Sequence, residues 1–65
     1  MSGIFYNPGA RRLVPVFEGT PQPEWAFVTH NLEASAHQCR RILREFLPAD
    51  VLSNVDFGWC EQRNS

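Results

Sequence analysis

The sequence predicts an α+β fold: a small antiparallel sheet packed against one amphipathic helix. We expect three strands in the sheet, or four if the C-terminal tail adds one. Two β-favouring runs flank a Pro-Gly turn, and a third follows a proline-rich linker. Apolar residues then recur at helical spacing. A helix of this kind can cover one face of a small antiparallel sheet.

Length and composition limit the chain to one small domain, residues 1–65, whose last residues, about 61–65, we expect to fray. The chain has 65 residues, of which 43% are hydrophobic, which is too apolar for a disordered chain. A domain of this size buries only about 60% of the surface of its unfolded chain, so we expect marginal stability. This marginal core and the alternating Val55, Phe57 and Trp59 of the tail suggest a homodimer.

The first two strands are predicted to form a hairpin. Residues 3–7 favour a strand, and Gly9, after Pro8, would take the positive φ of a type II turn. Residues 12–19 resume the β pattern, and Pro15 cannot donate to a ladder, which predicts either an edge strand or a bulge at that position. Alternation along this second strand places Leu13, Pro15 and Phe17 on one face and Val14 and Val16 on the other.

A linker and a third strand follow. Residues 19–24 contain two prolines and a glycine, which forbid regular structure. Residues 25–30 are rich in aromatic and β-branched side chains and predict a strand. Either of its faces could carry the core: Trp25, Phe27 and Thr29, or Ala26, Val28 and His30.

A helix is predicted across residues 32–47, ended by Pro48. It has two candidate starts. Asn31 could cap a helix that begins at the next residue. Ser35 with Gln38 forms a capping box, which would start the helix later. The predicted apolar stripe comprises Leu32, Ala36, Cys39, Leu43 and Phe46, widened by Ile42 and Leu47.

The tail is predicted in two pieces. Residues 48–53 would form a helical turn, with Pro48 at its first position. In residues 54–60 the side chains of Val55, Phe57 and Trp59 alternate, so this segment could add a fourth strand to the sheet.

A cationic stripe lies opposite the apolar face of the predicted helix. We interpret it first as a solvated face, steadied by the pairs Glu33–His37 and Arg41–Glu45. The alternative is a site for phosphate, nucleic acid or an acidic partner, because arginine binds such groups bidentately. A net charge of −1 and the lack of a nucleic-acid motif weaken this alternative. The candidate anion-binding residues are Arg11, Arg12, His37, Arg40, Arg41 and Arg44.

The sequence gives no grounds for an enzyme, a cofactor or a metal site. His37 and Cys39 are two apart on a helix and cannot form a nucleophile–base pair, and no zinc-ligand spacing is present. Two cysteines without a paired motif suggest a reducing compartment, although a Cys39–Cys60 bridge stays open. We expect a cytoplasmic protein with no signal peptide and no membrane span.

Several residues follow the order found in the MbtH-like proteins, small accessory partners of nonribosomal peptide synthetase adenylation domains. Phe5-Tyr6, the proline-led approach to Trp25, and Ser35 four residues before Cys39 carry the resemblance across roughly residues 3–47. It implies three antiparallel strands packed on a helix. The family's Ser-Leu-Trp-Pro signature is replaced here by Arg12-Leu13-Val14-Pro15, so only Leu13, Pro15 and Trp25 are carried over.

These observations together favour a non-catalytic accessory or regulatory protein that binds another protein. The runner-up is a nucleic-acid-binding regulator that uses the arginines, and a third alternative is an orphan protein of a phage or mobile element. The residues predicted to bind the protein partner are Leu13, Val14, Pro15 and Trp25.

Overall fold

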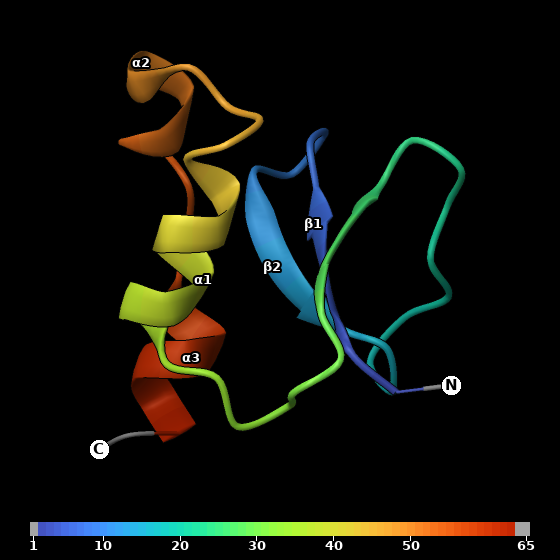
Figure 1. The fold of residues 1–65 in the computed structure, drawn as a ribbon. Helices are drawn as coiled ribbons and strands as arrows, with labels where there is room; N and C mark the ends of the chain where they lie inside the picture. The colour runs from blue at the N-terminus through green and yellow to red at the C-terminus, as the bar shows by residue number, and fades with distance from the viewer. Residues whose placement is uncertain (1, 64–65) are drawn as a thin grey trace.

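The computed structural model describes residues 2–63 of the chain, with side chains for residues 2–61, and confirms an α+β fold. A three-stranded antiparallel sheet is followed by three short helices (Figure 1). The elements in chain order are β1 (Ile4–Asn7), β2 (Arg12–Pro15), β3 (Ala26–Thr29), α1 (Ala36–Leu43), α2 (Ala49–Leu52) and α3 (Gly58–Arg63).

The strand order is β2-β1-β3, so β1 is central and both neighbours are antiparallel to it. The prediction that Pro15 marks an edge strand is confirmed, because β2 lies at one edge. Against β3, the register places Ile4 opposite Thr29 and Phe5 opposite Phe27. Val28 therefore has no opposite residue, which is a β-bulge in β3.

The hairpin between β1 and β2 forms as predicted, but its turn differs from the expected type. Arg11, and not Gly9, has the positive φ, 55°. The Asn7 side chain organises the loop, because its Oδ1 accepts hydrogen bonds from the backbone N–H groups of Gly9 (3.0 Å) and Ala10 (3.3 Å). This local hydrogen bonding moves the left-handed residue to the end of the loop.

The sheet has the three strands expected, and the optional fourth strand does not form in residues 54–60. Only Asp56 pairs with the outer edge of β2: its N–H donates to the Arg11 carbonyl (2.8 Å) and its carbonyl accepts from the Leu13 N–H (3.4 Å). Two residues later α3 begins and continues to Arg63. Of residues 61–65, which we expected to fray, 61–63 are helical and 64–65 lie outside the described residues. Phe57, directly before α3, accepts a backbone hydrogen bond from Glu61 through its carbonyl, and both Phe57 and Cys60 are buried.

Helix α1 uses the later of its two predicted starts. Ser35 caps it through a complete capping box: the Gln38 N–H donates to Ser35 Oγ, and Gln38 Oε1 accepts from the Ser35 N–H. The helix ends at Leu43 instead of Leu47. Phe46 therefore lies in a turn, 52% exposed, and does not belong to the buried stripe as predicted.

The short helix α2 confirms the helical turn predicted after α1. Pro48 is its N-cap, with an extended ψ of 157°, and does not occupy the first helical position as predicted. Ser53 Oγ donates to the Asp50 carbonyl at 2.8 Å and satisfies one carbonyl of this short helix.

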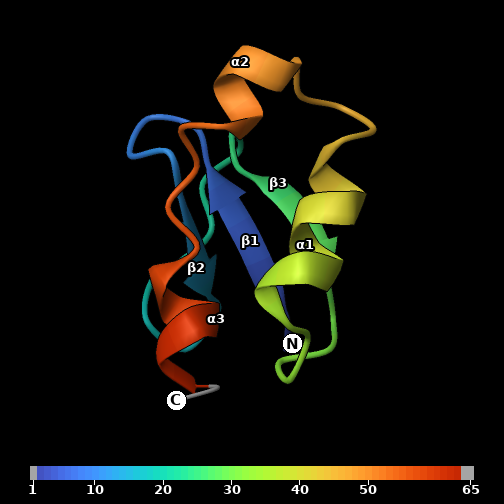
Figure 2. The same cartoon turned by 90° about the vertical axis from the view of Figure 1, so that its left-hand side faces the viewer.

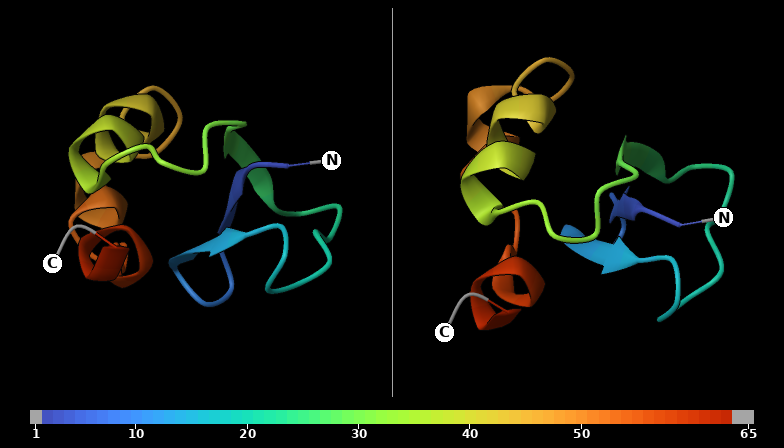
Figure 3. Two further views of the ribbon diagram at one scale, coloured as in Figure 1. Left: turned by 90° about the horizontal axis from the view of Figure 1, so that it is seen from below. Right: turned by 60° about the horizontal axis from the view of Figure 1, so that its bottom comes forward.

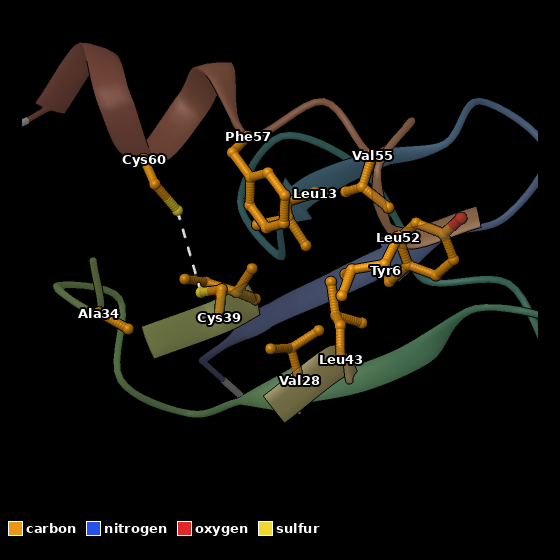
Figure 4. Packing of buried hydrophobic residues seen from close by; sticks show 11 residues of the cluster. Tyr6, Leu13, Val28, Ala34, Cys39, Leu43, Leu52, Val55, Phe57 and Cys60 are labelled. Atoms are coloured by element: carbon orange, nitrogen blue, oxygen red, sulfur yellow. Dashed lines mark hydrogen bonds between the residues drawn. The ribbon is translucent and has the colours of Figure 1, made fainter. Parts of the chain in front are cut away.

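The helices cover one face of the sheet and a loop lies on the other. In Figure 2, α1 and α3 stand in front of the strands; α1 packs on β3 and α3 on β2. Figure 3 shows residues 16–25 as a loop on the side of the sheet away from the helices. The core lies under the helices (Figure 4). Its members are Ile4, Tyr6, Leu13, Val28, Ala34, Cys39, Leu43, Leu52, Val55, Phe57 and Cys60.

Candidate functional site

The face of the sheet turned away from the helices carries a row of apolar side chains. Phe5 on the central strand lies opposite Val14 on one side and Phe27 on the other. The Phe5 and Phe27 rings meet edge to face, with centroids 5.3 Å apart and planes at 71°. Phe27 nevertheless remains 48% exposed. We call these residues, with Trp25, the aromatic sheet face.

Gly3 sets the close approach between the start of β1 and Phe27. Its φ is 151°, and a Cβ at this position would lie 2.8 Å from Phe27 Cε1 and 2.9 Å from the Thr29 carbonyl oxygen. No side chain fits there without displacing the backbone of β3. The position of the Phe27 ring on the aromatic sheet face therefore depends on this glycine.

Of the four residues predicted to bind a partner, three are buried within the chain. Leu13 is 1% exposed and belongs to the core under the helices. Val14 is 6% exposed and lies under the loop, where Gly19 comes between it and Trp25. Pro15 is fully buried as well. Only Trp25 keeps part of its surface exposed, so it alone of the four is available on the folded chain.

Two further aromatic side chains lie outside this face. Phe17 is 66% exposed and does not share the face of Leu13 as predicted, because β2 ends at Pro15 and a turn follows. Its ring packs against Trp59 of α3, with centroids 6.1 Å apart. Trp59 itself is half-buried against the core.

The structure exposes every residue of the predicted anion-binding set. His37, Arg40, Arg41 and Arg44 lie on α1 or at its C-cap, and Arg11 and Arg12 lie at the end of the hairpin. Within the described residues, neither predicted pair, Glu33–His37 or Arg41–Glu45, forms an ion pair. Glu33 falls outside the shortened helix, which removes the spacing on which its pair depended.

An open depression lies beside this helix surface, lined by Gln38, Arg41, Ile42 and Glu45. Arg41 can bind an anionic group there, but the Glu45 carboxylate in the same lining would repel that anionic group. The depression is therefore better suited to a neutral polar group than to phosphate.

The two cysteines come together in the core, which the sequence left open. Cys39 Sγ and Cys60 Sγ are 4.0 Å apart, and both residues are fully buried. Among the described residues, no group of three or more His, Cys, Asp or Glu side chains could hold a metal ion. In the same part of the chain, every helix is too short or too polar to cross a bilayer.

No protein-family model, curated protein or solved structure matches this chain. The candidate site therefore rests on geometry. Sequence reasoning did not select the Phe5–Phe27 pair, because both faces of the third strand carry apolar residues and alternation alone left its orientation undecided.

Proposed function

We propose that this chain is a small non-catalytic accessory or regulatory protein that acts by binding another protein through the aromatic sheet face. The observation that carries the proposal is the exposure of Phe27, which is 48% although its ring already packs on Phe5. Aromatic side chains that stay exposed in a patch with polar surroundings are typical of protein-binding surfaces.

The geometry also favours one form of partner. β3 is the second edge of the sheet, and in the described residues no strand other than β1 pairs with it. An edge strand presents backbone N–H and C=O groups to an incoming strand. An extended partner segment with apolar residues at alternate positions could therefore add beside β3 and cover Phe27. By contrast, Asp56 already occupies part of the edge of β2.

The test compares two phenylalanines with similar exposure. Phe27 lies on the aromatic sheet face and Phe46 lies in the turn after α1, 48% and 52% exposed. Cross-linking in cells with wild-type protein, Phe27→Ala and Phe46→Ala identifies candidate partners, and purified candidates are then titrated. We expect binding to weaken at least about tenfold for Phe27→Ala and to persist for Phe46→Ala. Equal binding by both variants would contradict the proposal.

Nucleic-acid binding is the second candidate, supported by the exposure of all five arginines of the predicted set. The test is a mobility shift with generic DNA and RNA at several salt concentrations, because phosphate contacts make affinity fall steeply with salt. A shift that is lost in the double variant Arg40→Ala/Arg41→Ala, and kept in Phe27→Ala, would replace the first proposal by this one.

The predicted homodimer and cytoplasmic location belong to the same proposal. Val55 and Phe57, part of the tail that suggested a dimer, pack into the core of their own chain. A dimer would therefore use another surface, and the aromatic sheet face, with Phe27 48% exposed, is the surface that we propose for it. Sedimentation of wild-type and Phe27→Ala protein at several concentrations decides between self-association and a foreign partner.

A further inference from the structure

The thiols of Cys39 and Cys60 meet between α1 and α3 within the buried cluster (Figure 4). The sulfurs are 4.0 Å apart, in contact but not bonded, and come from elements that are 21 positions apart in sequence. A disulfide requires an S–S distance of about 2.05 Å, so the sulfurs must approach each other by about 2 Å. Side-chain rotation and a small shift of α3, which has six residues, can provide this approach.

We propose that Cys39 and Cys60 form a reversible intramolecular disulfide that ties α1 to α3 and makes the stability of the protein depend on redox conditions. The oxidant is a small-molecule disulfide such as oxidised glutathione. One cysteine, as thiolate, attacks it, forms a mixed disulfide and releases one thiolate. The second cysteine then attacks the mixed disulfide, forms the Cys39–Cys60 bond and releases the other. The two protons lost by the cysteines go to the two released thiolates.

Access to the thiols depends on the opening of α3. Both cysteines are fully buried, so the oxidant cannot reach them in the closed protein. α3 has six residues and carries one of the two cysteines, Cys60. Its first N–H, that of Gly58, donates to Asp56 Oδ1 at 2.8 Å. Short elements can open locally at a small fraction of the free energy of global unfolding. Oxidation therefore proceeds through brief detachment of α3, and the bond then prevents that detachment.

The bond also has a thermodynamic consequence. It closes a loop of about 20 residues, which restricts the unfolded chain more than the folded one. For a domain of this length we expect the melting temperature to rise by roughly 10 °C or more. Trp59, the neighbour of Cys60, packs on Phe17, so its fluorescence reports on whether α3 is docked.

The experiment treats the folded wild-type chain with excess oxidised glutathione without denaturant, blocks remaining thiols with iodoacetamide, and measures intact mass and melting temperature. The expected product is a single chain lighter by two hydrogens, without adducts, with a higher melting temperature that returns to its starting value on reduction. Glutathione adducts, bonds between chains, unreacted thiols, or an unchanged melting temperature would each overturn the proposal.

A pair of variants tests the route through α3. Asp56→Ala removes the hydrogen bond at the start of α3, whereas the carboxylate of the exposed Asp50, on α2, makes no such bond in the described residues. We expect Asp56→Ala to form the disulfide about fivefold faster than wild type, and Asp50→Ala to match wild type. Equal rates of disulfide formation in the two variants would show that the oxidant does not reach the thiols through detachment of α3. If the aromatic sheet face proved not to bind a partner, this result would be unaffected, because the thiols lie on the other side of the sheet, under the helices.

Discussion

The two faces of the sheet are closed to different degrees. Under the helices, 11 residues from all six elements and their connections form one buried cluster. On the other side, a loop buries Val14 to 6% exposure but leaves Phe27 at 48%. Both faces carry apolar side chains, yet the helices of the described residues cover only one of them. The comparison teaches that apolar residues beyond the capacity of the core become the candidate binding surface.

The comparison predicts a large cost for truncating the helix-covered face. Leu43 of α1 is fully buried, so Leu43→Ala should lower the free energy of unfolding by about 2–5 kcal/mol. A domain of this length has about 3–10 kcal/mol in total, so much of the variant should be unfolded. Urea unfolding followed by circular dichroism measures the change. Phe46→Ala, three residues further on and 52% exposed, is the control and should lose less than about 1 kcal/mol.

An intermediate cost is expected at the glycine that holds the outer face together. Gly3→Ala places a Cβ 2.9 Å from the Thr29 carbonyl oxygen at a φ of 151°, and should cost about 1–3 kcal/mol. Gly9→Ala is the matched control, because Gly9 does not have a positive φ and its Cβ would meet only Asn7 Oδ1, at 3.4 Å. Thermal melts of both variants compare them. A larger loss at Gly9 would restore the type II turn that the sequence predicted.

The smallest expected effect lies at the start of α1, the helix that closes the inner face. Ser35→Ala removes the capping hydrogen bond to the Gln38 N–H and should cost about 1 kcal/mol. Ser35→Asp keeps an acceptor there and should recover most of the loss. Denaturant titrations of both variants and of Asn31→Ala make the comparison. If Asn31→Ala proved the more damaging, the helix would begin at Leu32 in solution.

The parts of the fold that follow from neighbouring residues could be predicted. The hairpin, the edge position imposed by Pro15 and the capping box at Ser35 depend on local φ and hydrogen-bond chemistry. Burial of Cys39 and Leu43 followed from their helical spacing, and both are fully buried. The length of α1 was overestimated because Phe46 continues the apolar spacing after the backbone has left the helix.

The tail shows why periodicity alone was insufficient. Val55, Phe57 and Trp59 fit a strand, whereas Phe57 and Cys60 fit a helix, and the sequence contains both spacings. In the folded chain, Asp56 pairs with β2 and Cys60 is buried beside Cys39, and these contacts accompany a helix, α3, in place of a strand. These are contacts between residues far apart in the chain, and local patterns carry no information about them.

The sequence by itself determined the class of fold, the hairpin, the place of the third strand and the polar side of α1, because each depends on residues only a few positions apart. The tertiary structure alone decided which face of the sheet the helices cover, that Val14 and Pro15 are buried, that Phe27 is exposed, and that two thiols lie in contact. Burial is a property of the assembled chain: a side chain leaves water only when a distant segment packs over it.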